Sequence, residues 1–543
     1  MQEDKAQVGF GFLRRLSCCL LAAVAAEAAW VAVSDVVDRI VGTHSEDLSF
    51  RELVRGVPEN GRIAYLCFGS ECLDSFERSS LIEMNWEVIP NMVQTVDWSG
   101  VQSYDGSIVT DDKSDDCRCE MESRGFVCVA TNGLSALYRR TEASAAPVTP
   151  AAVSREPSRL TFGSSASVVL VVVLLAGLWL WFGGFSPPGG VRLLAALGIC
   201  AVLLAVALPG GLNAPNGLGV YGGKAKLICL LHGLPDGFWT APEYAVFQPS
   251  YPPLMTLAAL LSFLVGGVSD RALQLFVPAV AAILFLELTR FAPARGRRRW
   301  LVLSVVSLFL LSPETVRLAR GFYAEPLAML FIACGWNALL DGRPRRGWLA
   351  LGLSALVRPE GLVIAGISWF VWIFGVSVRR RWRATALSAA LALSPGIAWQ
   401  LAMRFLGARL YDYDLLHLPG FECFVDARVQ LVRATVGDFA LNGGVFLFSA
   451  LLVALSFAGV PGRPSGEGSG APSARRTVTA AVLVTALSLL AGAVLISFST
   501  CPDREWLYEM TLPRYALLCV LPMLLSGTRF AGAEESLLPR KRG

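Results

Sequence analysis

The sequence predicts an all-α polytopic membrane protein with about 12–13 hydrophobic segments and a small N-terminal α/β extracytoplasmic domain. Of its 543 residues, 54% are hydrophobic and only 17% are charged, and the apolar residues gather into runs near membrane-spanning length. Basic residues cluster in the short loops between these runs, which is typical of cytoplasmic loops. The one long polar stretch, after the first run, carries strand-like patterns instead.

Changes of composition divide the chain into five parts. They are a membrane anchor helix (1–34), the α/β domain (35–140), a linker rich in Ala, Pro, Ser and Thr (141–166), the membrane core (167–528) and a cytoplasmic tail (529–543). The first apolar run follows Arg14 and Arg15, as in a cleaved signal peptide. Glu27, Trp30 and the lack of a clear cleavage signal favour an uncleaved anchor with a cytoplasmic N-terminus.

The polar segment after the anchor is predicted to fold as a small domain. Between residues 35 and 159, acidic residues outnumber basic ones by 21 to 12, which argues against a nucleic-acid-binding surface. The residue patterns predict strands at Arg62–Phe68 and Gly106–Thr110 and a helix at Ser75–Met84. They also predict a terminal hairpin of Phe126–Val129 with Leu134–Tyr138.

The cysteines of this segment have two interpretations. They are Cys67, Cys72, Cys117, Cys119 and Cys128, and one or two disulfides are expected outside the cytoplasm. The alternative is a metal site at Cys117 and Cys119, near Asp111, Asp112, Asp115 and Asp116. The spacing is C-x-C, no histidine is nearby, and such an Asp run is more often a solvated loop, so no metal is predicted.

The membrane core is predicted from a series of apolar runs, several of them shorter than the roughly 20 residues that a crossing helix needs. The candidate spans are Leu16–Ser34, Val168–Phe185, Leu193–Leu208, Leu254–Val268, Ala272–Phe291, Trp300–Leu311, Pro326–Leu340, Trp348–Val357, Leu362–Val378, Ala384–Met403, Val445–Val460, Val478–Phe498 and Leu512–Leu525. Short spans interrupted by Pro or Gly indicate helices that are broken around a cavity.

The positive-inside rule assigns the basic loops near 343–346, 379–383 and 463–476 to the cytoplasm, and therefore the loop 210–252 to the outside. One basic group conflicts with this scheme. Arg295 and Arg297–Arg299 also belong in the cytoplasm, yet two apparent spans separate them from the external loop. One of those two spans is therefore predicted to be re-entrant or interfacial.

The loop 209–253 holds the densest unusual chemistry of the core. Lys224 and Lys226 follow Gly222 and Gly223, and this combination suits a phosphate, because glycine lets backbone N–H groups approach and lysine supplies charge. The alternative is a pair of interfacial lysines on a surface helix over residues 224–232. Three scattered histidines do not suggest a metal cluster, and no catalytic triad, Walker loop or dinucleotide fingerprint occurs in a suitable context.

Several motifs in this core resemble, in order, the external loops of the GT-C class of integral-membrane glycosyltransferases (family-39-like), which use polyprenyl-phosphate sugars. Asn216, Tyr221, Lys224 and Ala225 are in register with D-x-x-x-x-W-x-x-K-A, and Q-P-S-Y-P from Gln248 is similar to H-P-D-Y-P. Three further segments are also similar: G-F-Y-A-E-P-L-A from Gly321, L-V-R-P-E-G from Leu356, and W-L-Y-E-M-T-L-P-R-Y-A-L-L from Trp506. The resemblance covers roughly residues 165–528.

The resemblance implies an inverting transfer of a hexosyl or pentosyl group, with a first-loop carboxylate as base. Here that position holds Asn216, which cannot take a proton, and Ser250 replaces a frequent aspartate. Glu243 or Asp236 of the same loop is therefore predicted to have taken over. Glu243 is favoured, since nearby Trp239, Tyr244 and Tyr251 suit sugar stacking and a raised carboxyl pKa.

The leaving phosphate needs fixed cationic donors. Arg358, before Pro359 at the end of a span, is the main candidate, with an ion pair to Glu360 at the interface as the alternative. Arg317 and Arg320 would share a helix face if their span continues past Pro313, although snorkelling at a helix end is the favoured explanation of both. Arg514 is a weaker candidate. Glu325 is expected to orient the acceptor or to join a cation site, and Trp239 and Tyr251 to contact sugar or acceptor.

The expected function is transfer of a sugar from a polyprenyl-monophosphate donor to a glycan, lipid or protein acceptor of the cell envelope, on the extracytoplasmic face. The expected location is a bacterial inner membrane, although a secretory-pathway membrane is physically equivalent. No cofactor other than the lipid donor is implied. Two alternatives are a degenerate, non-catalytic subunit that binds a lipid-linked glycan and a transporter or flippase of such a glycan.

Overall fold

The computed structural model describes residues 62–66, 92–96, 107–110, 115–124, 126–131, 136–140, 189–208, 216–231, 233–235, 237–240, 244, 247–266, 270–293, 296–376, 382–408, 474–497 and 514–533. Helix makes up 80% of this interpretable part, in agreement with the predicted all-α core. Among the described residues, strands occur only before residue 141.

The N-terminal part is a five-stranded sheet of order β2-β1-β3-β5-β4. Its strands are β1 (Arg62–Leu66), β2 (Met92–Val96), β3 (Ser107–Thr110), β4 (Phe126–Thr131) and β5 (Ala136–Arg140). β1 pairs in parallel with β2 and β3, whereas β5 pairs antiparallel with β3 and β4. The predicted strands at residues 62 and 106 and the terminal hairpin are confirmed. The predicted helix Ser75–Met84 lies outside the described residues.

The second half of the Asp-rich segment is helical and not a loop, whereas Asp111 and Asp112 lie outside the described residues. Asp115 and Asp116 begin helix α5 (Asp115–Ser123), where acidic side chains are favourable at the positive end of the helix dipole. Cys117 and Met121, four residues apart, share its buried face, and Cys119 is exposed. Because Cys67 and Cys72 lie outside the described residues, the disulfide prediction stays a prediction. Within the described residues no group of His, Cys, Asp or Glu side chains could hold a metal.

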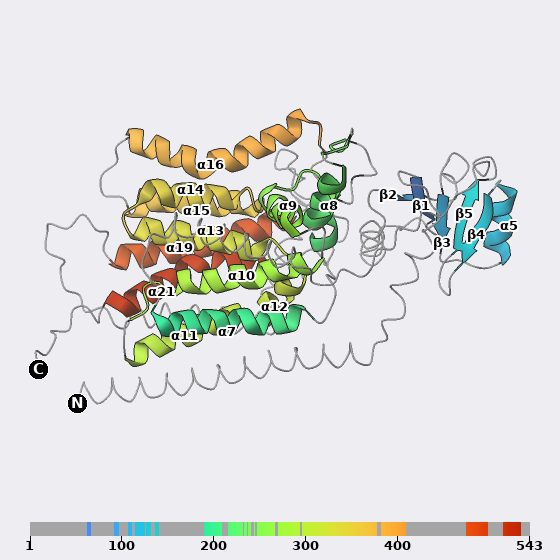
Figure 1. Ribbon diagram of the computed structural model, residues 1–543. Helices are drawn as coiled ribbons and strands as arrows, with labels where there is room; N and C mark the ends of the chain where they lie inside the picture. The colour runs from blue at the N-terminus through green and yellow to red at the C-terminus, as the bar shows by residue number, and fades with distance from the viewer. Residues whose placement is uncertain are drawn as a thin grey trace, which may run out of the picture.

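The C-terminal part is a bundle of helices that lie roughly along one direction (Figure 1). Its elements are α7 (Gly190–Ala207), the π-helical turn η3 (Asn216–Tyr221), α8 (Gly222–Leu231), α9 (Leu254–Gly266), α10 (Asp270–Leu288), α11 (Arg297–Leu310), α12 (Pro313–Arg320), α13 (Glu325–Leu340), α14 (Pro344–Ser354), α15 (Glu360–Val371), the π-helical turn η5 (Trp372–Val376), α16 (Trp382–Phe405), α19 (Ala474–Ser497) and α21 (Leu521–Ala533). Most predicted spans correspond to one of these helices. Leu16–Ser34, Val168–Phe185 and Val445–Val460 lie outside the described residues.

Helix α13 is the centre of the bundle, because all of its residues are buried. It packs against α14, α10 and α21, while α7 and α16 lie on the outside and expose large apolar side chains. Two described helices, Gly190–Ala207 and Ala384–Phe405, are long and apolar enough to cross a membrane. The bent pair Arg298–Leu310 and Glu314–Arg320 becomes a third if it counts as one span.

The two ends of α13 define the two ends of the bundle. Glu325 begins this helix and Asp341 caps it, so the two lie about 24 Å apart at 1.5 Å per residue. We call these the Glu325 end and the Asp341 end. Helices α7 and α10 run antiparallel, since Gln274 donates to the carbonyl of Ala207 at 3.1 Å and Arg192 donates to that of Leu286 at 2.7 Å.

This geometry identifies which of two apparent spans does not cross the bundle. Helix α9 begins at the Glu325 end, where the N–H of Leu254 donates to the carbonyl of Leu356 at 3.0 Å. It ends at Gly266, only four residues before α10 begins at the same end. Both ends of α9 therefore lie near the Glu325 end, and α10 alone carries the chain to the Asp341 end. The start of α11, with Arg298 and Arg299, therefore lies at the Asp341 end.

Candidate functional site

Four charged side chains form a buried arginine–carboxylate cluster at the Glu325 end. The guanidinium of Arg358 makes a bidentate ion pair with Glu360, with Nε–Oε2 and Nη2–Oε1 distances of 3.0 and 2.5 Å, and its Nη1 contacts Glu325. Arg514 Nη1 lies 3.4 Å from Glu325 Oε1. All four residues are less than 10% exposed. The predicted pair between Arg358 and Glu360 therefore exists, but it is buried among helices rather than at an interface.

Local sequence explains why the cluster forms. Pro359 caps helix α15, so Arg358 lies in the short break between α14 and α15. Glu325 and Glu360 occupy the first turns of α13 and α15, where a carboxylate is favourable. Two positive and two negative charges balance, which lets the group stay buried. Glu325 Oε2 has no hydrogen-bond partner among the described residues, so it can accept a bond from a ligand hydroxyl.

Two buried lysines, Lys224 and Lys226, lie at the same end of the bundle as the arginine–carboxylate cluster. Lys224 is 5% exposed and Lys226 is 8% exposed, so the surface-helix alternative is wrong. The ammonium of Lys224 donates to the carbonyl of Gln248 at 3.3 Å and is 3.5 Å from that of Tyr251. Burial lowers the pKa of Lys224 to about 7.

The glycines before Lys224 have a packing role that the sequence did not indicate. A side chain at Gly222 would collide with the carbonyl of Gly217 and would lie 2.9 Å from Leu273 Cδ1. Gly222 is therefore needed where the turn η3 passes into α8, and this need accounts for it without a phosphate.

Tyr221 is close to Lys224 and to the arginine–carboxylate cluster. Its ring lies 6.0 Å from Lys224 Nζ and makes an edge contact with the Tyr251 ring, whose centroid is 6.1 Å away. Burial raises the pKa of the Tyr221 hydroxyl, and the charge of Arg358 acts on it in the opposite direction. Tyr221 therefore lies near both Lys224 and the arginine–carboxylate cluster.

Further contacts, several of them to backbone carbonyls, hold the segments at the Glu325 end together. The N–H of Leu254 donates to the carbonyl of Leu356, and the Trp399 indole N–H donates to the carbonyl of Ser250 at 2.8 Å. Arg514 stacks over Tyr323 at 5.2 Å. Five separate sequence segments thus meet at the Glu325 end: 216–225, 248–254, 321–328, 356–361 and the start of 514–533.

Two residues at this end have a strained backbone. Gln248 and Phe322 have φ values of 45° and 52°, and they are the only positive-φ residues other than glycine among the described residues. Such a conformation costs about 1–3 kcal/mol and persists where surrounding contacts enforce it, often at functional sites. The bond from Lys224 to the Gln248 carbonyl is one of those contacts.

The other predicted site residues are placed as follows. Arg317 pairs with Glu314 of its own helix, at 2.6 and 3.0 Å, and lies close enough to Glu325 of the cluster to feel its charge. Arg320 ends the same helix, α12, which begins anew at Pro313 after a bend of 54° from α11, so the span does not continue as one helix. Trp239 lies in an aromatic group, with ring centroids 5.2 Å from Phe238 and 6.5 Å from Trp399.

Three predicted catalytic residues remain untested. Glu243 and Asp236 lie outside the described residues, and Asn216 begins η3 with its side chain undescribed. Arg514, the weaker candidate from the sequence, contacts Glu325 in the cluster, and the strained backbone at Gln248 was not predicted. The only signal for Arg514 was its place after Pro513 in a motif-like segment. The chain matches no family model, no curated protein and no solved structure.

Proposed function

We propose that this protein is a multi-pass membrane glycosyltransferase that transfers a sugar from a polyprenyl-monophosphate donor to a cell-envelope acceptor. One observation supports it most. The five segments that resemble GT-C loops lie far apart in the sequence, yet they meet at one end of the bundle around buried cations. Such convergence, shown for the described residues of these segments, is expected of an active site.

The orientation follows from the basic loops. Arg298 and Arg299 begin α11, and Arg343–Arg346 lead into α14, both at the Asp341 end. The positive-inside rule assigns that end to the cytoplasm and the Glu325 end to the outside. Leucines exposed on α7 and α16 then face lipid, and the site opens toward the extracytoplasmic leaflet, where the polyprenyl chain of a donor would lie.

In the proposed reaction, an acceptor oxygen attacks the anomeric carbon as the bond from that carbon to the phosphate oxygen breaks. The bonding electrons leave with polyprenyl phosphate, and Arg358 and Arg514 stabilise its developing charge. The acceptor proton passes to the carboxylate base, for which Glu243 or Asp236 is proposed. Glu325 Oε2, which lacks a hydrogen-bond partner in the described structure, accepts a hydrogen bond that orients the acceptor hydroxyl.

The decisive experiment measures release of polyprenyl phosphate from a panel of polyprenyl-monophosphate sugars. The protein is used in nanodiscs, with envelope extract as the source of acceptor. Release should be lost in Arg358→Ala and in Glu243→Gln but kept in Arg404→Ala, a matched loss of one exposed arginine from α16. If the donor bound saturably without being released, and Arg358→Ala abolished that binding, the non-catalytic binder would be favoured. Asn216 supports this alternative because it replaces the expected carboxylate. Donor movement across the bilayer without release would favour a flippase.

Donor binding should weaken as the pH rises above about 7. The cluster is electrically balanced, so a donor phosphodiester adds one negative charge that Lys224 can offset when protonated. Below pH 7 its amine is already charged. Above pH 7 binding requires uptake of a proton, which costs about 1.4 kcal/mol per pH unit, or up to tenfold in affinity. Tyr221 stays protonated in this window because burial raises its pKa.

Titrating donor binding between about pH 6 and 9 in wild type and Lys224→Met checks this expectation. Lys224→Met should bind the donor weakly, and its donor affinity should not change with pH over this range. If donor affinity depended on pH equally in both proteins, Lys224 would not be a ligand of the phosphate.

A further inference from the structure

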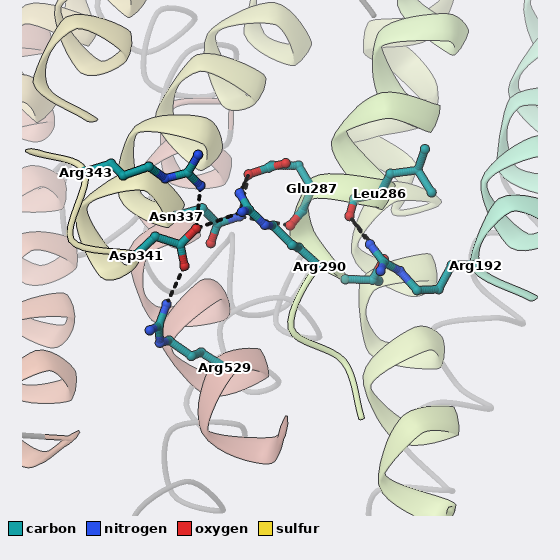
Figure 2. A network of polar contacts seen from close by, with 9 residues as sticks. Arg192, Leu286, Glu287, Arg290, Asn337, Asp341, Arg343 and Arg529 are labelled. Carbon is teal, nitrogen blue, oxygen red and sulfur yellow. Dashed lines mark hydrogen bonds and ion pairs between the residues drawn. The ribbon is translucent and has the colours of Figure 1, made fainter. Parts of the chain in front are cut away.

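The polar side chains at the Asp341 end hold helices together (Figure 2). Asp341 accepts from three arginines of separate segments: Arg290 at 2.8 Å, Arg343 at 2.6 Å and Arg529 at 3.2 Å. Glu287, which is fully buried, accepts from Asn337 Nδ2 at 2.8 Å. These contacts link α10, α13, α14 and α21, and this packing role accounts for the cluster without a ligand.

Gln248, at the Glu325 end, has a buried amide that no such packing role explains. The residue is 7% exposed, and its side-chain Oε1 has no hydrogen-bond partner in the described structure. The hydrogen bonds that Gln248 receives go to its backbone carbonyl, from Lys224 Nζ at 3.3 Å and from the Tyr251 N–H at 3.0 Å. Asn337 Oδ1 is likewise unpartnered, but the amide of Asn337 already holds Glu287 through Nδ2. A buried polar atom without a partner is costly, so a ligand that supplies the missing bond is expected at Gln248.

The backbone of Gln248 is held in a conformation that its local sequence does not favour. Its φ of 45° lies in the left-handed region, which residues other than glycine seldom adopt. The next residue is Pro249, and a residue before proline prefers an extended backbone. Lys224 and the Tyr251 N–H oppose this preference, because both bind the Gln248 carbonyl. The protein therefore fixes the base of this side chain at a local cost, as is common where a residue contacts a ligand.

Lys224 brings the Gln248 amide within reach of a donor sugar. In the proposed function, the ammonium of Lys224 meets the donor phosphate. A glutamine side chain keeps Oε1 within about 7 Å of its own carbonyl oxygen, so Oε1 lies within about 10 Å of Lys224 Nζ. A hexose attached to a phosphate at Lys224 extends over a similar length. Its hydroxyls can both donate and accept, which suits the oxygen and the nitrogen of an amide.

We propose that the side-chain amide of Gln248 binds one hydroxyl of the donor sugar and thereby determines which sugars the site accepts. The ligand class is a sugar that carries this hydroxyl, because the corresponding deoxysugar would leave the buried amide unpaired. A polyprenyl phosphate without a sugar gains nothing from Gln248. This inference rests on the proposed function, from which it takes the donor and the place of its phosphate.

The test measures equilibrium binding of lipids to the full chain in nanodiscs. The ligands are the polyprenyl-phosphate hexose that wild type binds most tightly, its deoxy analogues with one hydroxyl removed at a time, and polyprenyl phosphate without a sugar. In wild type, one deoxy analogue should bind about tenfold more weakly than the parent, or worse. Gln248→Met has a side chain of similar length but no amide. It should lose a similar factor for the parent, lose nothing further for that analogue, and bind polyprenyl phosphate alone like wild type.

Two further variants separate sugar recognition from folding. Gln248→Gly removes the amide but favours the left-handed backbone, so the turn should be kept and the sugar-dependent affinity lost as in Gln248→Met. Gln94→Met makes the same side-chain change in strand β2 of the N-terminal sheet and is the matched control. It should bind every lipid like wild type.

Equal losses of affinity for polyprenyl phosphate with and without sugar, in both Gln248 variants, would refute recognition and leave Gln248 a structural role. Losses in Gln248→Met that add to those of every deoxy analogue would show that the amide binds no hydroxyl. Failure of the proposed function gives a different result. If wild type bound neither lipid, the donor would be wrong and the inference would fall with it. If the expected affinities were found but no polyprenyl phosphate was released, the transfer reaction would be refuted while the role of Gln248 in sugar recognition was supported.

Discussion

Replacement of Arg358 by methionine is expected to destabilise the protein by about 3–5 kcal/mol and to abolish donor binding. The guanidinium of Arg358 neutralises Glu360 and Glu325, both buried. Its removal leaves Glu360 without this bidentate partner and Glu325 with only Arg514, at 3.4 Å. Buried carboxylates that lose their partner are costly, so thermal or denaturant unfolding of the purified protein should reveal the loss directly.

A double variant separates stability from function. Arg358→Met with Glu360→Gln removes one charge of each sign, so the cluster stays balanced and most of the lost stability should return. Donor binding should remain absent, because the phosphate ligand is gone. Recovery of both stability and binding in the double variant would show that Arg358 is only structural. A single variant as stable as wild type would contradict the buried ion pairs.

Gly361→Ala is expected to lower stability by about 1–3 kcal/mol and to reduce activity more than tenfold. An added Cβ would lie 2.5 Å from the Ser354 carbonyl oxygen and 2.7 Å from the Ala355 N atom. These are backbone atoms, so the start of α15 must move away from the end of α14. Arg358 and Glu360 lie at that junction and would be displaced together. Unfolding and donor-release assays on the same preparation measure both effects.

The same helix provides the control for this substitution. A Cβ at Gly366 would meet only Leu393 Cδ2, at 3.5 Å, which is an ordinary contact. Since alanine is favoured over glycine within a helix by roughly 0.5–1 kcal/mol, Gly366→Ala should leave activity intact and slightly raise stability. Equal behaviour of the two alanine variants would mean that close packing at Gly361 does not position the cluster.

The bundle explains why a site of this kind forms at a helix end. Its centre, along α13, is apolar, while the polar side chains gather at the two ends where helices stop and loops begin. Helix breaks at Ser312–Pro313 and Arg358–Pro359 expose backbone and direct charged residues toward one another. Glycine at 361 lets the start of α15 pack closely against the end of α14. The positions of prolines and glycines therefore determine where the cations can meet.

Much of the site could be predicted from the sequence because the motifs are local. Glu325 was selected from the resemblance of its segment to a GT-C loop, and Lys224 and Arg358 from their position beside breaks in apolar runs; each is buried at the same end of the bundle. Arg317 was selected for the same reason, yet it pairs with Glu314 three residues earlier. Spacing alone cannot distinguish a charge that finds a partner on its own helix from one that reaches another helix.

Sequence patterns were enough to predict the helical class of the core, most helix positions and four of the five described strands of the N-terminal sheet, because apolar periodicity and turn residues act over a few neighbours. They predicted neither β2 nor α5. The tertiary structure alone decided that α9 does not cross the bundle, that Glu325 is shared between Arg358 and Arg514, and that Lys224 holds the Gln248 loop. These facts depend on contacts between residues far apart in the chain. Such contacts are set by how whole helices pack, and no local pattern records them.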